Sequence, residues 1–107
     1  MKIFHATPRA NIESIKENGL LASKAKKKDK FVWLHTPSRS HWAIIHTCKN
    51  HKADWDDVAI IEIDIPRSWL KAHKLTIQGK GMNGFWKCNR DIPVEFFTDI
   101  HDSEDYA

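Results

Sequence analysis

The sequence predicts a single α+β domain, and three observations support that prediction. Strand and helix patterns alternate over the first part of the chain and short strands follow, a segregation that favours α+β over a doubly wound sheet. The length of 107 residues suits one domain. Hydrophobic residues make up 41% of the chain and include five Trp and five Phe, so an aromatic-rich core can form.

The chain opens on a short strand, expected over residues 2–5, that leads directly into a helix. Thr7 is of a type that caps helix N-termini, and Pro8 suits the first helical position, where its missing N–H is not needed. These two residues explain a helix start but not the His5 before them. His5 is therefore a candidate site residue, unless it simply bonds to backbone at the start of the helix.

The first helix should end at a glycine. Ile12 and Ile15 mark one apolar face of this helix. Gly19 stands where a left-handed helix stop is expected, and Leu20 would then fold back onto Ile15. Residues 23–30 follow with five lysines and no apolar residue larger than alanine. That composition indicates a surface loop, either solvated or in contact with phosphate.

A second strand and a second helix come next. Residues 31–35 are expected to form the strand, and residues 39–50 the helix, with Ser38 as its N-terminal cap. The helix is expected to turn three apolar side chains toward the core, which are Trp42, Ile44 and Ile45.

The clearest strand covers residues 58–65, because one of its faces is wholly apolar and the other is half charged. Pro66 ends it, and residues 67–72 can form one helical turn. The apolar face holds Ala59, Ile61, Ile63 and Ile65, and the mixed face holds Val58, Ile60, Glu62 and Asp64.

The last part of the chain is expected to contain short strands at residues 75–77, 85–88 and 96–100, with a turn at 79–84. One domain therefore covers residues 1–100, and the acidic tail of residues 101–107 is expected to be loose.

Charge and cysteine content limit the classes of partner and compartment. The formal charge of +3 and pI of about 8.9 permit a phosphate-bearing or polyanionic partner without requiring one. Cys48 and Cys88 lie far apart in sequence and are expected to be reduced thiols. We see no signal peptide and no apolar run of the ~20 residues that span a bilayer. We therefore expect a cytoplasmic protein without membrane contact.

A metal site is not expected. His41, His46 and His51 are each five residues apart, whereas neighbours on a helix face are three or four apart, so these rings would drift around the helix. Cys48 and His51 would share a face, but two ligands make a poor site.

A glutamate in an apolar setting is a further candidate. Glu95 follows Val94 and precedes two phenylalanines. Apolar surroundings raise the pKa of a carboxylate and disfavour an idle charge, so Glu95 is expected to point into a cleft or out to water.

Three stretches in order resemble the motifs of the ADP-ribosyltransferase fold superfamily, and together they span nearly the whole chain. IFHAT and PRANIESIKENGL resemble its opening strand with a His-x-Thr triplet and the helix that follows. FVWLHTPSRSHWA resembles its second motif, a strand with an aromatic residue, a polar turn and a helix. RDIPVEFF resembles the third, in which a glutamate sits near the final strand.

The resemblance implies a fold of two small, mostly antiparallel sheets that form a cleft, flanked by two helices. It also implies an enzyme that cleaves the nicotinamide–ribose bond of NAD and transfers ADP-ribose to an acceptor, such as a protein or a nucleic acid. His5 and Thr7 would hold the ribose and the nicotinamide amide, and the ring of Trp33 would stack on nicotinamide. Glu95 would stabilise the positive charge that develops on the sugar. Arg9 and Trp42 are further candidates to contact NAD.

Two alternatives use the same scaffold. The related RNA 2′-phosphotransferases rely on histidines and arginines, which makes Arg9, Arg39 and Arg90 candidate phosphate contacts, because a guanidinium grips phosphate with two hydrogen bonds. Alternatively, the protein is a catalytically inactive module that binds a nucleotide or a nucleic acid. This last hypothesis rests on Ala6 and Trp33, which stand where the family usually has glycine and tyrosine.

Overall fold

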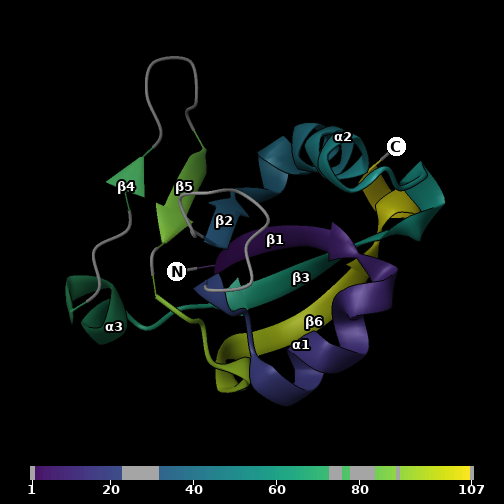
Figure 1. The fold of residues 1–107 in the computed structure, drawn as a ribbon. Coiled ribbons are helices and arrows are strands. Elements are labelled where there is room, and N and C mark those ends of the chain that lie inside the picture. The colour runs from purple at the N-terminus through teal and green to yellow at the C-terminus, as the bar shows by residue number, and fades with distance from the viewer. Residues whose placement is uncertain (1, 23–31, 73–75, 78–83, 89, 107) are drawn as a thin grey trace.

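Six antiparallel strands form one sheet around which the molecule is built (Figure 1). The computed structural model describes residues 2–22, 32–72, 76–77, 84–88 and 90–106. The strands lie side by side in the order β4-β5-β2-β1-β3-β6, so the first strand of the chain is central. Their bounds are β1 (Lys2–Pro8), β2 (Val32–His35), β3 (Val58–Asp64), β4 (Thr76–Ile77), β5 (Phe85–Cys88) and β6 (Phe97–Asp102).

The sheet is continuous, whereas two separate sheets were expected. β1 pairs with β3 along its full length, from Lys2↔Asp64 to Pro8↔Val58. Between β1 and β2 a single registered pair, Phe4↔His35, is present. The α+β class is therefore confirmed, and the two halves of the sheet, β4-β5-β2 and β1-β3-β6, are joined at that one pair.

A helix lies against each face of the sheet, over its own apolar cluster. α1 (Ile12–Asn18) packs Ile12 and Ile15 onto a cluster that includes buried residues of β1, β2 and β3. α2 (Ser40–His51) places Ile44 in a second cluster. The first cluster includes Ile3, Leu34, Ile61 and Ile63, and the second includes Phe4, Val58 and Ile60.

The alternation predicted for β3 is confirmed. Ala59, Ile61, Ile63 and Ile65 are all fully buried. On the mixed face the two apolar residues are buried as well, Glu62 is partly buried and Asp64 is exposed. The short helix α3 (Arg67–Ala72) follows, also as predicted.

The predicted cap of the first helix is wrong. β1 continues past His5 to Pro8, and Thr7 lies within it opposite Ala59. A 3-10 turn, η1 (Arg9–Asn11), comes next, and α1 begins at Ile12. The physical reason is that β3 offers a ladder partner along the whole of β1, so the strand does not end where a cap would be needed.

The helix ends at Gly19 as predicted, although with ψ −172° the glycine does not adopt the left-handed helical stop that was expected. Its φ is 79°, and its N–H donates to the Ile15 carbonyl at 2.7 Å. A Cβ at this position would lie 2.5 Å from the carbonyl oxygen of Ile92. Both the positive φ and this close approach therefore require glycine. Leu20 then exchanges two backbone hydrogen bonds with Ile92 and lies in the cluster onto which Ile15 packs.

The inward face of α2 differs from the prediction. Ile44 is fully buried, but Trp42 is 54% exposed and Ile45 is 38% exposed. Ser38 does not cap the helix, because its hydroxyl bonds to Thr36 Oγ1 at 2.9 Å and a 3-10 turn, η3 (Pro37–Arg39), precedes α2. The buried face is set by Ser40, Ala43, Ile44 and Thr47, whose spacing leaves positions 42 and 45 on the opposite side.

The C-terminal residues pack onto the domain, although a loose tail was expected. β6 runs to Asp102, and Ser103–Tyr106 form the 3-10 turn η6. Ser103 is fully buried and donates to the Trp55 carbonyl at 2.7 Å, while the Trp55 indole N–H donates back to the Ser103 carbonyl at 3.2 Å. The reciprocal bonds tie η6 to the turn η4 (Trp55–Asp57), so the end of the chain is part of the fold.

Other predicted segments are confirmed or lie outside the described residues. β5 covers the predicted residues 85–88, while β6 begins at Phe97 because Val94–Phe96 form the 3-10 turn η5. The lysine-rich segment 23–30 and most of the turn at 79–84 lie outside the described residues. No helix in the described part of the chain is long and apolar enough to cross a membrane.

Candidate functional site

His5 lies where β1 and β2 part, a place we call the β1–β2 seam and define by His5, Trp33 and His35. The Nδ1 of His5 is 2.6 Å from the backbone carbonyl oxygen of Trp33. A carbonyl can only accept, so Nδ1 carries the proton and donates. Burial is the largest effect on the pKa of His5 and lowers it. The hydrogen bond to the Trp33 carbonyl raises this pKa by less, and the charge of His51 lowers it further. The ring is therefore neutral, and its Nε2 presents a lone pair.

A second neutral imidazole belongs to the seam. His35 is 2% exposed, and its Nε2 is 3.2 Å from the hydroxyl of Ser40 on α2. Burial, and then the proximity of His5, lowers the pKa of His35 to about 3. The rings of Phe4 and Phe85 contact it, with centroids 5.9 Å and 6.3 Å away. Apolar rings and a hydroxyl thus surround an imidazole that stays uncharged at neutral pH.

Thr7 and Trp33 were expected to form one site with His5, and the structure places only Thr7 on the same side of the sheet as His5. Thr7, two positions further along β1, is 4% exposed and by strand alternation shares the side of His5. Val32 and Leu34 belong to the cluster under α1, so the ring of Trp33 between them emerges on the α2 side of the sheet. Ile3 also belongs to the cluster under α1, so His5, two positions further along β1, lies on the opposite side from the Trp33 ring and meets Trp33 at its backbone carbonyl.

Glu95 lies away from the seam. It is exposed on η5, just before β6, and β3 separates β6 from β1 (Figure 1). Ile92 is fully buried, and Phe96 and Phe97 pack against the core, whereas Val94 and Glu95 between these anchors are both exposed. Of the two orientations expected for Glu95, the structure has the outward one.

The three arginines come from separate elements. Arg9 forms an ion pair with Asp102 at 2.6 Å and donates from Nε to the Asp56 carbonyl at 2.7 Å. Arg39 packs near Gly84, where an added Cβ would lie 2.9 Å from its Cγ. Arg90 is exposed after β5. Trp42, the remaining candidate, is exposed on the outer side of α2.

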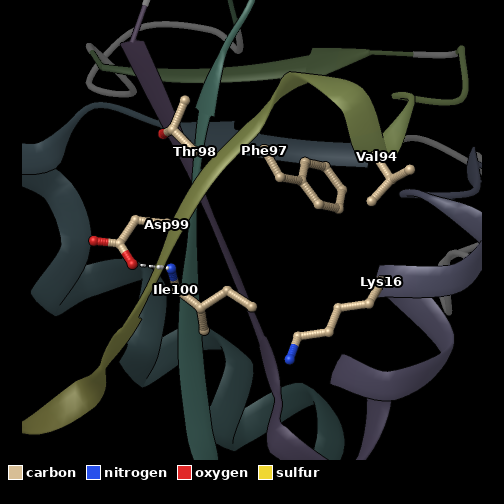
Figure 2. Close-up of a pocket in the computed structure, with 6 residues that line it drawn as sticks. All are labelled: Lys16, Val94, Phe97, Thr98, Asp99 and Ile100. Atoms are coloured by element: carbon tan, nitrogen blue, oxygen red, sulfur yellow. Dashed lines mark hydrogen bonds between the residues drawn. The ribbon is translucent and has the colours of Figure 1, made fainter.

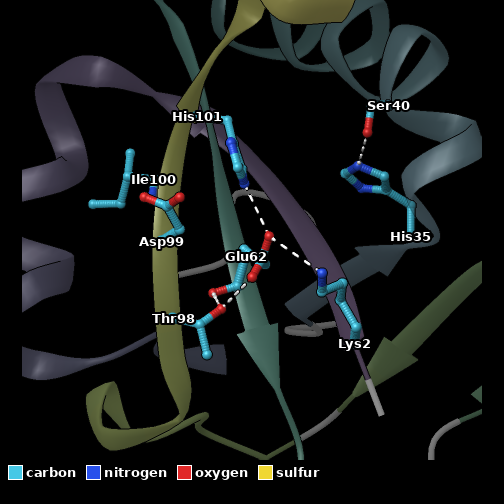
Figure 3. Close-up of polar contacts among 8 residues, drawn as sticks. All are labelled: Lys2, His35, Ser40, Glu62, Thr98, Asp99, Ile100 and His101. Atoms are coloured by element: carbon cyan, nitrogen blue, oxygen red, sulfur yellow. Dashed lines mark hydrogen bonds and ion pairs between the residues drawn. The ribbon is translucent and has the colours of Figure 1, made fainter.

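A polar cluster that sequence reasoning missed lies on the α2 side of β1, β3 and β6 (Figure 3). Glu62 accepts from Thr98 Oγ1 at 2.6 Å and bonds His101 Nε2 at 3.0 Å, and Lys2 Nζ is 3.8 Å away. The hydrogen bonds from Thr98 and then His101 lower the pKa of Glu62. The half-charged face of β3 could have indicated Glu62 as a site residue. His101 was missed because residues 101–107 were expected to form a loose tail.

A groove open to solvent lies between α1 and β6, with a volume of about 400 Å³ (Figure 2). The side chains of Lys16, Phe97 and Ile100 point into it, whereas Asp99 turns away and its carboxylate accepts the N–H of Ile100 at 2.8 Å. The groove lacks a buried polar group aimed at a ligand among the residues that line it. Within the described residues, no group of three His, Cys, Asp or Glu side chains could hold a metal ion.

Comparisons with known proteins support the fold. No family model and no curated protein matches the chain. Among solved structures, the chain is similar to protein CC0527 from Caulobacter crescentus, a structural genomics target, with a TM-score of 0.63 and 16% sequence identity. The match covers 95% of this chain and 85% of that one. At this level of identity, the likeness shows a common fold.

Proposed function

We propose that the protein binds a nucleotide, NAD or a close chemical relative, at the β1–β2 seam, with His5 as the principal contact. The observation that carries the proposal is the hydrogen bond from His5 Nδ1 to the Trp33 carbonyl. This bond fixes both the tautomer and the direction of the ring, and the neutral Nε2 can then accept a hydrogen bond from a ribose hydroxyl. The resemblance to ADP-ribosyltransferases assigns the same residue to ribose contact.

The site supports binding better than it supports transfer of ADP-ribose. Cleavage of the nicotinamide–ribose bond needs a carboxylate near the sugar, where positive charge develops. Glu95 is exposed and lies beyond β3 from His5. Glu62 occupies the α2 side of β3, where Thr98, His101 and Lys2 engage it. We therefore favour the catalytically inactive binding module over the transferase.

The RNA 2′-phosphotransferase hypothesis has less support. It needs guanidinium groups that are available to phosphate and that converge on one site. Arg9 is instead paired with Asp102 and bonded to a backbone carbonyl, and Arg39 and Arg90 belong to other parts of the fold.

The test is NAD titration followed by thermal shift and calorimetry, together with a direct assay for released nicotinamide. We expect a saturable stabilisation at millimolar NAD or below that is lost in His5→Ala and retained in Glu95→Gln. His46→Ala is the matched control, because it removes an exposed imidazole from α2.

Two results would overturn the proposal in different ways. A folded protein without any NAD-dependent shift would show that the seam does not bind this ligand. Nicotinamide release that disappears in both His5→Ala and Glu95→Gln would show an enzyme that cleaves NAD, which the inactive-module proposal excludes.

A further inference from the structure

The outer face of α2 combines an exposed aromatic ring with positive charge. Trp42 is 54% exposed, and Ile45, His46 and Lys49 follow it at intervals of three, four and seven residues, which places all four on one side of the helix. Lys52 continues the row at the C-terminal cap, where it adopts the left-handed conformation with φ 52°. We call this surface the α2 face.

The charge of this face is of one sign. The sequence contains no Asp or Glu from residue 32 to residue 53, a stretch that covers β2, η3 and the whole of α2. Acidic side chains begin outside it, at Asp54 in the chain and at Glu104 and Asp105 on η6. A ligand with negative charge would therefore approach along the row from Trp42 to Lys49, about 10 Å of helix.

The Trp42 ring rests against an anchored neighbour. The imidazole of His41 lies edge-on to it, with centroids 6.3 Å apart and an interplanar angle of 88°. His41 is in turn held by the ring of Trp55, 5.1 Å away, and its Nδ1 donates to the Tyr106 carbonyl at 3.1 Å. An exposed ring braced in this way is a platform on which a flat group can stack with little further loss of freedom.

From these observations we propose that the α2 face binds single-stranded nucleic acid, with a base stacked on Trp42 and phosphates near Lys49 and Lys52. One aromatic platform next to cations is the combination that binds single strands without sequence preference. A protein–protein interface usually has a wider apolar centre. Among the described residues of this face, only Trp42 and Ile45 are large exposed hydrophobic residues, so a protein partner is less well matched. The α2 face is distinct from the β1–β2 seam, so the proposal stands apart from nucleotide binding at His5.

The experiment is fluorescence anisotropy of an end-labelled 20-nucleotide oligothymidylate titrated with the protein at several salt concentrations. We expect micromolar binding at low salt. Trp42→Ala should weaken it by roughly 5- to 150-fold, the range for removal of one stacking platform, while Trp42→Phe retains most of the affinity. Lys49→Glu should weaken binding and make the salt dependence less steep by about 0.7 in log–log slope, because one phosphate fewer is neutralised by the protein.

Lys16→Glu is the matched control for charge, because Lys16 is exposed on α1, which packs on the other face of the sheet. Equal losses of affinity in Lys16→Glu and Lys49→Glu would mean that overall basicity drives binding, and the α2 face would be refuted. Absence of binding at low salt, or unchanged affinity in Trp42→Ala, would refute it as well. So would sedimentation showing a dimer of the free protein that Trp42→Ala dissociates, since the face would then be an interface between two copies. His5→Ala should leave oligonucleotide binding intact.

Discussion

His35 should make the stability of the fold fall as the solution becomes mildly acidic. The imidazole is 2% exposed, and burial lowers its pKa from the ordinary value of 6.5 to about 3. Between these two values the unfolded chain binds a proton that the folded protein does not, so the free energy of unfolding rises with pH. Integrated from pH 7 to pH 5, the difference amounts to about 2 kcal/mol from this residue alone.

The assay is urea denaturation at pH 7, 6 and 5, for the wild type and for His35→Gln. Glutamine keeps a polar group near Ser40 but does not titrate. We expect the variant to be less stable at pH 7 and to lose about 2 kcal/mol less than the wild type between pH 7 and pH 5. His5→Gln should act in the same direction, because burial lowers the pKa of His5 too.

The reasoning would be refuted by a His35→Gln variant whose stability declines with acidity as steeply as that of the wild type. Such a result would mean that the folded protein takes up a proton at His35, either by opening the contact between β2 and α2 or by rotating the ring to water. A wild-type stability that does not change between pH 7 and pH 5 would refute it equally.

Two further predictions concern Gly19 and Glu62. Gly19→Ala should lower the free energy of unfolding, measured by chemical denaturation, by at least about 2 kcal/mol, because the residue has φ 79° and a Cβ would lie 2.5 Å from the Ile92 carbonyl oxygen. The control is Glu17→Ala, an exposed position on the same helix, which should change the free energy of unfolding by no more than about 0.5 kcal/mol. Equal losses in the two variants would contradict the argument. In Glu62→Gln, the fall in stability below about pH 4.5 should be shallower than in the wild type, since hydrogen bonds from Thr98 and His101 lower the folded pKa of Glu62 and the unfolded chain takes up the proton first. Parallel declines of both proteins between pH 5 and pH 3 would count against it.

The parts of the fold that the sequence predicts well are those with a local physical signal. β3 follows from strict alternation of apolar residues, which does not depend on what the strand packs against. Gly19 follows from the need for a positive φ at the end of a helix. Both features are properties of a few consecutive residues, and both are confirmed.

The wrong predictions depend on partners distant in sequence. Thr7 has the chemistry of a cap, but β3, more than fifty residues later, extends the strand beyond it. Trp42 and Ile45 are hydrophobic, yet the buried face of α2 is made by Ile44 and by the smaller residues Ser40, Ala43 and Thr47. Hydrophobicity alone does not fix the rotation of a helix about its axis.

The candidate site divides along the same line. His5 stood out because nothing local explained an imidazole at that point, and it does bond to backbone, although to the neighbouring strand and not to the helix start. Glu95 was identified by its apolar neighbours, and two of them, Phe96 and Phe97, turned out to be anchors on the core, while Val94 is exposed like Glu95 itself. The Glu62–His101 pair joins residues of two strands, and no short motif could have shown it.

The central place of β1 determines when this sheet can form. The neighbours of β1 in the sheet are β2 and β3, and both are synthesised after β1. Ile3 therefore has no strand partner on the β3 side until Ile63 has been synthesised. Likewise, Leu20 finds its backbone partner only at Ile92. During synthesis, β1 can pair with β2 at Phe4, but its ladder with β3 cannot form until β3 has emerged, a period in which a chaperone can bind its apolar residues. With so many contacts between distant residues, we expect refolding in milliseconds to seconds, not microseconds.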